Sequence, residues 1–347
     1  MLQCVEGRDR EIPLLPPDPK GPGSYQPGHQ RAHEGEERRR LRPFEDIEVV
    51  GLGQACVDYL GRVPSFPQED GKVELLDLTS QCGGPASTAL VTLSRLGIKT
   101  SFLGAISDDP VGAGILKGLQ EDRVDHSFLR ITPGHTSQFA FIAVSRQSGN
   151  RTIFWHRGSV PPLKKEEIDL SPFTGARVLH LDGLMIEASM EAARQAKARG
   201  LKVVLDAGTL REGSLELAAH VDVLIASARF AVPLVGENAP PEKALEALSR
   251  CGPGEIVITL GSKGSVGWNR SRLLGQSAFP VDAVDTTGTG DVYHGAYIYG
   301  LLQGWDMCAC MRFASAASAL KCRAVGARAG IPRLGDVLQF LETNPGI

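Results

Sequence analysis

The sequence lacks several features that mark common protein classes. Its seven cysteines form no C-x-x-C pair and no Cys/His cluster with metal-ligand spacing, which favours reduced thiols over a zinc site. No segment has eighteen consecutive apolar residues, and the start of the chain has no continuous apolar core of a signal peptide. We therefore expect a cytoplasmic protein with no membrane partner.

A strong excess of one charge is also missing. The formal net charge is −3 over 347 residues, and the Lys and Arg residues are scattered. A protein that binds the phosphate backbone of a nucleic acid usually carries a basic patch, so we expect no such partner. A small-molecule substrate is the more natural expectation.

Two common nucleotide-binding motifs are missing as well. The sequence contains no G-x-x-x-x-G-K-[ST], the motif of a P-loop. The glycine-rich stretch GLGQACVD has Cys56 where the third glycine of a G-x-G-x-x-G dinucleotide fingerprint would stand. A P-loop enzyme and a Rossmann-type oxidoreductase are therefore poor fits.

The chain divides into an extension and one large domain. Residues 1–45 are rich in Pro, Gly and charge without an apolar period, which predicts a disordered extension. Over residues 46–347, short runs rich in Val, Ile and Leu alternate with stretches of helical spacing. The runs are IEVVGLG, TSFLGAI, ARVLHLD, LKVVLDA, VDVLIAS and EIVITLG. This alternation predicts an α/β fold with a mainly parallel sheet and helices on both faces.

Two regions interrupt the alternation, within about residues 60–82 and 136–157. Each resembles a pair of strands with no helix between them. We expect these strands to form a small antiparallel lid at one edge of the main sheet. Ligands of open parallel sheets bind beyond the carboxyl ends of the strands, so such a lid would close over the substrate.

The stretch VDTTGTGDVYHGA, which starts at Val284, places small residues directly before a predicted helix. Its glycines allow a ligand to approach the backbone closely. The N–H groups of Thr289, Gly290 and Asp291 would point outward at the positive end of the helix dipole and form an anion hole. A carboxylate beside a bound anion is repelled by it, so its position there indicates a chemical role. Accepting the proton of an attacking hydroxyl is such a role.

DTTGTGDVYHGA closely resembles the second signature of the ribokinase-like PfkB sugar kinases, with Thr289 in place of the usual Ala. GGPASTALVTLSRLG, which starts at Gly83, resembles the first signature of that family. VITLGSKGSVGW resembles its T-L-G-x-x-G turn, and FASAASALKCRAVGARAGIP resembles the helix and loop that wall its adenine pocket. The resemblance runs in order from about Ile47 to Glu342.

The resemblance implies a ribokinase-like three-layer sandwich with a β lid, and ATP-dependent phosphorylation of a hydroxyl on a sugar or sugar-like substrate. It implies ATP and Mg²⁺ as cofactors, a monovalent cation such as K⁺ held at Asp285, and a homodimer formed through the lid. The implied catalytic residues are Asp291 as general base with Gly288, Thr289 and Gly290. The implied substrate-binding residues are Asp58, Gly83, Gly84 and Thr88. The implied nucleotide-binding residues are Gly261, Ser262, Gly264 and Thr287.

The sequence departs from the family pattern at two places. Thr88 stands where many members have an Asn that contacts the sugar, which leaves the choice of sugar open. Ser227 and Phe230 stand where many have the Asn and Glu of an N-x-x-E stretch that organises magnesium, so no protein ligand for Mg²⁺ is named. The motifs look most like the branch of sulfofructose and other ketose-type kinases.

Two alternatives remain open. The first is a non-catalytic sugar- or nucleotide-sensing protein on the same fold, which the missing glutamate favours and Asp291 opposes. The second is a nucleoside kinase, for which Phe139 or Trp155 near the lid could stack on a base. For an anionic sugar, Lys72, Arg151 and Arg157 are the candidate cations.

Overall fold

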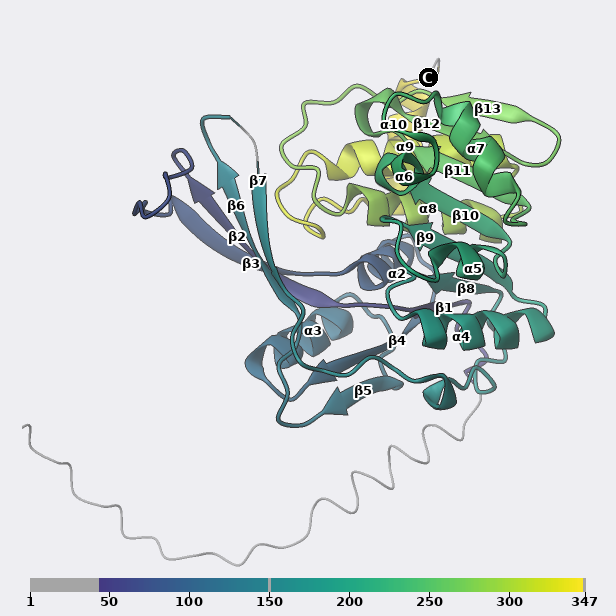
Figure 1. Cartoon of the computed structure of the whole chain (residues 1–347), viewed down its shortest axis with the longest axis horizontal. Coiled ribbons are helices and arrows are strands. Elements are labelled where there is room, and N and C mark those ends of the chain that lie inside the picture. The colour runs from purple at the N-terminus through teal and green to yellow at the C-terminus, as the bar shows by residue number, and fades with distance from the viewer. Residues whose placement is uncertain (1–43, 149–150, 346–347) are drawn as a thin grey trace, which may run out of the picture.

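The expected buried strands form the centre of one large sheet (Figure 1). The structure, a computed structural model, describes residues 44–148 and 151–345. The six predicted strands are β1 (Val49–Leu52), β4 (Thr100–Ser107), β8 (Val178–Leu181), β9 (Lys202–Ala207), β10 (Val223–Ser227) and β11 (Glu255–Thr259). The edges are β5 (Leu129–Thr132), β12 (Ser265–Trp268) and β13 (Leu273–Gln276). The order is β13-β12-β11-β10-β9-β8-β1-β4-β5, parallel from β11 to β5 and antiparallel at β12 and β13.

Helices cover both faces of this sheet. They are α2 (Pro85–Arg95), α3 (Pro110–Glu121), α4 (Ile186–Ala198), α5 (Ser214–Ala218), α6 (Ala228–Val235), α7 (Pro241–Ser249), α8 (Thr289–Leu302), α9 (Met307–Lys321) and α10 (Leu334–Thr343). Short 3₁₀ turns are η1 (Lys165–Glu167) and η2 (Gly261–Lys263). Neighbouring residues on a strand point to opposite faces, so Val49 packs with α2, α8 and α9 while Val50 packs with α4 and α7. This arrangement confirms the predicted α/β sandwich of three layers.

The predicted lid is a second, smaller sheet that projects from the body (Figure 1). Its strands are β2 (Cys56–Val63), β3 (Asp77–Gly83), β6 (Phe139–Ser145) and β7 (Arg151–His156), in the order β3-β2-β6-β7. The outer pairs are antiparallel as expected, whereas β2 and β6 pair in parallel. β3 leads directly into α2, so the lid is joined to the helix of the first signature.

The N-terminal extension lies outside the described residues apart from its last two positions. Phe44, which was assigned to the extension, packs against Phe128 and Phe173 at ring-centroid distances of 5.5 and 5.6 Å. Phe44 therefore packs as part of the domain. Within the described ranges no helix has the length and apolarity needed to span a bilayer.

Candidate active site

The second signature folds into a tight loop followed by α8. Gly288 caps the helix with a φ of 72°, a left-handed conformation that favours glycine. A Cβ atom added there would lie 2.9 Å from Ala327 in the C-terminal loop, residues 322–333. The helix begins at Thr289, so Asp291 lies in its first turn. Position 288 has no room for a side chain because the C-terminal loop packs directly against it.

The start of α8 offers fewer free N–H groups than the sequence predicts. The N–H of Thr289 donates to the carbonyl of Thr286 at 3.3 Å, because the loop closes a turn just before the helix. The N–H groups of Gly290 and Asp291 have no acceptor among the described residues. The predicted anion hole is therefore reduced to these two groups at the positive end of the helix dipole.

The carboxylate of Asp291 is partly exposed and accepts no hydrogen bond from the described part of the chain. Burial, and then the negative charge of Asp206, raise the pKa of Asp291 to about 7 against an opposing effect of His294. A carboxyl group with a pKa near neutrality can accept a proton and release it again. Asp291 therefore has the properties that a general base needs.

Three polar residues that were not predicted from the sequence lie near Asp291. Asp182 follows β8, Asp206 lies at the end of β9, and His294 lies one turn along α8. His294 Nε2 is 3.2 Å from Asp206 Oδ1, and both side chains are buried. The neighbouring His180 ring is 6.0 Å from the His294 ring, and burial lowers the pKa of His180 to about 4. A sequence signal existed, because Asp182 directly follows one buried parallel strand and Asp206 lies at the end of another.

These residues share one cavity. Asp182, Asp206, His294 and Asp291 line a space of about 270 Å³ that also touches Pro85 at the start of α2. A second cavity, of about 540 Å³, shares Thr259 and Gly290 with the first. The two spaces meet at Gly290, and neither is lined by the predicted sugar-binding residues Asp58, Gly83, Gly84 and Thr88.

The second cavity contains most of the predicted nucleotide-binding residues. Gly261, Ser262 and Gly264 line it together with Tyr293 and residues of α9. Its lining is mainly apolar, which suits a flat aromatic base. Thr287 is not among its lining residues, because the Thr287 hydroxyl donates to Asp285 Oδ1 at 2.7 Å.

The predicted sugar-binding carboxylate, Asp58, lies on β2 at the base of the lid. The Cys56 thiol donates to Asp58 Oδ1 at 3.3 Å. Burial raises the pKa of Asp58, against the opposing effects of Cys56 and Arg328. A Cβ atom at Gly83, on the neighbouring strand, would overlap Asp58 Oδ2. Glycine is therefore required at position 83 so that Asp58 can keep this position.

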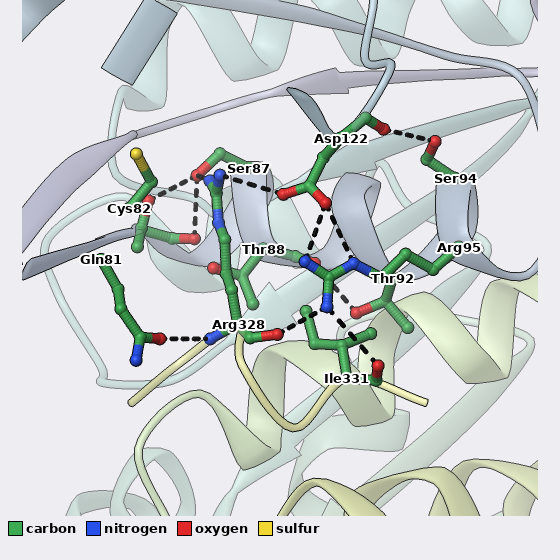
Figure 2. Close-up of polar contacts among 12 residues, drawn as sticks. Gln81, Cys82, Ser87, Thr88, Thr92, Ser94, Arg95, Asp122, Arg328 and Ile331 are labelled. Atoms are coloured by element: carbon green, nitrogen blue, oxygen red, sulfur yellow. Dashed lines mark hydrogen bonds and ion pairs between the residues drawn. The ribbon is translucent and has the colours of Figure 1, made fainter. Parts of the chain in front are cut away.

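Figure 2 shows how the first signature is held against the C-terminal loop. Arg328 is 5% exposed; its Nη2 donates to Ser87 Oγ at 3.0 Å, and its Nη1 lies 3.8 Å from Asp122 Oδ2. Ser87 Oγ donates in turn to the carbonyl of Gly83 at 2.6 Å. Thr88 is fully buried, and its hydroxyl has no partner within the described ranges, so it is closed off from solvent in this conformation.

Asp285, the predicted cation ligand, is already surrounded by donors. Its Oδ1 accepts hydrogen bonds from Thr287, and its Oδ2 accepts one from the N–H of Gly326 at 2.7 Å. Burial acts to raise the pKa of Asp285, but these hydrogen bonds outweigh it and the pKa falls below its ordinary value. The buried Lys321 ammonium donates to the Asp285 carbonyl at 2.9 Å. Asp285 is therefore an ionised carboxylate whose two oxygens already accept hydrogen bonds; K⁺ binding there stays a prediction.

The two positions that replace the N-x-x-E motif have other functions. The Ser227 hydroxyl caps α6 by accepting from the N–H groups of Arg229 and Phe230, and Phe230 is 1% exposed. In residues 44–148 and 151–345, no three His, Cys, Asp or Glu side chains are grouped to hold a metal on their own. Mg²⁺ usually keeps several waters and binds one or two carboxylates together with substrate phosphates, so the carboxylates of the first cavity fit such an ion.

Comparison with known proteins identifies relatives along nearly the whole domain. The ribokinase of Haemophilus influenzae is 28% identical over 301 residues, which cover 84% of this chain and 97% of the relative. The nucleoside kinase of Methanothermobacter thermautotrophicus is 24% identical over 306 residues, covering 87% and 98%.

Solved structures agree on the fold. The ribokinase of Thermotoga maritima superposes with a TM-score of 0.76 at 24% identity, covering 85% of this chain and 99% of that one. The ribokinase of Arabidopsis thaliana, solved with ribose and ATP, gives a TM-score of 0.76 at 23% identity, covering 87% and 99%. The sequence pattern of the pfkB family carbohydrate kinases matches residues 46–334. This chain therefore belongs to the pfkB family of carbohydrate kinases.

Proposed function

We propose that the protein transfers the terminal phosphoryl group of ATP to a hydroxyl of a sugar or sugar-like substrate, with Asp291 as the general base. The observation that carries this proposal is the position of Asp291. Its carboxylate has no hydrogen-bond partner within the described residues, its pKa is raised to about 7, and it lies beside two free N–H groups where two cavities meet.

In the proposed reaction, the substrate hydroxyl oxygen forms a bond to the terminal phosphorus of ATP. The bond from that phosphorus to the bridging oxygen breaks, and ADP leaves with the electron pair. Asp291 takes the hydroxyl proton, while the N–H groups of Gly290 and Asp291 stabilise charge on the transferred group. The main contributions are positioning and fixed dipoles, since the transition state requires little covalent chemistry from the protein.

The two substrates occupy opposite ends of this site. Asp58 and the backbone of Gly83 and Gly84 bind the sugar, because a carboxylate accepts hydrogen bonds from two neighbouring hydroxyls. The nucleotide lies in the larger cavity along Gly261 and Ser262. When bound with ATP, Mg²⁺ supplies positive charge that offsets the charge of the phosphates.

The lid also presents an exposed apolar strand. Its outer strand β7 is exposed along its whole length, and Ile153, Phe154 and Trp155 are 51%, 60% and 47% exposed. Apolar side chains grouped on one exposed strand favour contact with another surface. We therefore extend the proposal to a homodimer formed through the lid.

A nucleoside kinase is the second candidate. It is favoured by the relative named nucleoside kinase and by Trp155, an exposed aromatic on the lid. A sensor without activity is less well supported, because such a protein has no use for a base with a raised pKa beside free N–H groups.

The test is an ADP-release assay with ATP and Mg²⁺ over a panel of ketoses, pentoses, phosphorylated and sulfonated sugars, keto-acid sugars and nucleosides. Asp291→Asn is assayed in parallel, and Asp282→Asn, at an exposed carboxylate of the preceding loop, is the matched control. The proposal expects turnover on one class that Asp291→Asn removes and Asp282→Asn keeps. Ligand binding without ADP release from any substrate would contradict it and favour the sensor.

A further inference from the structure

The smaller cavity contains more carboxylate groups than the reaction needs. Asp182, Asp206 and Asp291 all line it, and Asp291 is assigned to the proton. Negative groups in one confined space repel one another and repel the phosphates of ATP. Arg211 lines the same cavity and supplies one positive charge against three carboxylates, so further positive charge is needed when a nucleotide is bound. The question is which carboxylate binds its source.

Both oxygens of Asp182 accept hydrogen bonds from the backbone of the protein. Its Oδ2 accepts from the N–H of Gln54 at 2.6 Å, and its Oδ1 accepts from the N–H of Leu184 at 3.1 Å. Burial raises the pKa of Asp182 to about 7, against these hydrogen bonds. Asp182 thus ties the loop after β1 to the loop after β8 and has little capacity left for a ligand.

One carboxylate oxygen of Asp206 accepts no hydrogen bond from the described residues. Its Oδ1 contacts His294 Nε2, and no N–H or hydroxyl of the described residues donates to its Oδ2. The side chain is 10% exposed, and that exposure faces the cavity it lines. Burial acts to raise the pKa of Asp206, but the nearby His294 outweighs it and the pKa is lowered, so the carboxylate is charged near neutral pH.

His294 fixes the direction of this carboxylate. It projects from α8 one turn beyond Asp291, so a single helix carries both the proposed base and the partner of Asp206. Its Nδ1 is buried without a hydrogen-bond partner in the described ranges. Because Nδ1 makes no hydrogen bond there, the contact of Nε2 with Asp206 is the polar contact that orients the His294 ring.

We propose that Asp206, oriented by His294, binds the water shell of the Mg²⁺ that enters with ATP, in place of the glutamate of the N-x-x-E motif. This inference rests on the proposed kinase function and names a residue for its metal. Ser227 is occupied as a helix cap and Phe230 is a core residue, so neither replacement can serve. An ion bound through water and phosphate needs one such carboxylate, which agrees with the absence of a three-residue metal cluster among the described residues.

The arrangement predicts that metal and nucleotide bind together. The protein alone should bind Mn²⁺, used as a spectroscopic substitute for Mg²⁺, only weakly. Addition of ADP should create a tight site that electron paramagnetic resonance detects as loss of free Mn²⁺. This readout requires neither a sugar nor turnover.

The test compares the wild type with Asp206→Asn, His294→Gln and Glu212→Gln, an exposed carboxylate before α5, as the matched control. Asp206→Asn should weaken Mn²⁺ binding in the presence of ADP by about 10- to 100-fold, the usual effect of losing a group that orients bound ligands. Its affinity for ADP without metal should be unchanged or higher, because a negative charge is gone. His294→Gln should show the same loss in smaller measure, and Glu212→Gln should show none.

Each other result overturns a defined claim. Wild-type Mn²⁺ affinity in folded Asp206→Asn would remove Asp206 from the metal site. An equal loss of ADP binding with and without metal would make Asp206 a structural or nucleotide-binding residue instead. If Asp206→Asn does not fold, unchanged metal binding in His294→Gln overturns the proposal. A wild type that binds no nucleotide under any condition contradicts the proposed function itself.

Discussion

The guanidinium Nη1 of Arg151, on lid strand β7, lies 2.7 Å from the hydroxyl of Thr286 in the loop before α8, although the two residues are 135 positions apart in the chain. The same Nη1 is 3.6 Å from Asp285 Oδ1. The lid therefore touches the second signature directly through one cation. This cation is one of those considered for an anionic sugar, and its observed partners are groups of the catalytic loop.

Arg151→Ala should disturb the lid more than the fold. The Arg151 side chain is 36% exposed and lies 3.6 Å from the Asp285 carboxylate, which keeps its hydrogen bonds to Thr287 and Gly326 in the variant, so the melting temperature should change by at most about 2 °C. Turnover at low substrate should fall by roughly tenfold, because a lid contact worth about 1.4 kcal/mol changes a rate by that factor. Steady-state kinetics would measure this. Arg157→Ala, which removes a cation stacked on Trp155, is the control.

Asp291→Asn should lower kcat by roughly two to four orders of magnitude, the usual range for losing a positioned base. The affinity for ADP, measured by calorimetry, should stay close to wild type. A correctly folded variant with near-normal turnover would show that the proton goes elsewhere.

The pH profile should report the raised pKa of Asp291. The base must be ionised to accept a proton, so kcat/KM, which reports the free enzyme, should fall about tenfold per pH unit below about pH 7. An ordinary aspartate would keep the rate flat down to about pH 4. Asp206 is the second cause of the raised pKa, so Asp206→Asn should move this acid limb to lower pH. A limb that stays at the same pH in Asp206→Asn would contradict the assignment.

The same shift predicts that Asp291 lowers stability at neutral pH. A carboxyl whose pKa is higher in the folded than in the unfolded state binds more protons when folded between about pH 4 and 7. Its contribution to the free energy of unfolding therefore decreases as the pH rises through that window. Asp291→Asn should melt at a higher temperature than the wild type at pH 8 and should differ little at pH 4. Scanning calorimetry at both values tests this, and equal shifts would rule out the titration as the cause.

Gly83→Ala should weaken sugar binding selectively. A Cβ atom at position 83 displaces the Asp58 carboxylate, and losing a hydrogen bond to a charged group costs roughly 10- to 100-fold in affinity. KM for the sugar should rise by that factor while KM for ATP stays unchanged. Gly275→Ala, at a glycine on β13 with open space around it, controls for the effect of an added methyl group. An equal rise in both KM values would place the damage outside the sugar site.

The fold and the family could be predicted from local sequence patterns and motifs. The buried strands and the order of helices follow from local periodicity, which each segment carries within a few residues. The start of the helix could also be predicted locally. Gly288, which caps it, and Asp291, in its first turn, are only three residues apart. The predicted strands and the predicted sandwich are confirmed for this reason.

Tertiary structure alone decided the composition of the site. Asp206 and His294 are far apart in the chain and meet only because β9 lies beside the start of α8. It also decided which predicted groups are free: a turn engages the N–H of Thr289, and burial closes off the Thr88 hydroxyl. Hydrogen bonds, burial and repulsion between charges depend on distances across elements, and these distances are set by packing rather than by local sequence.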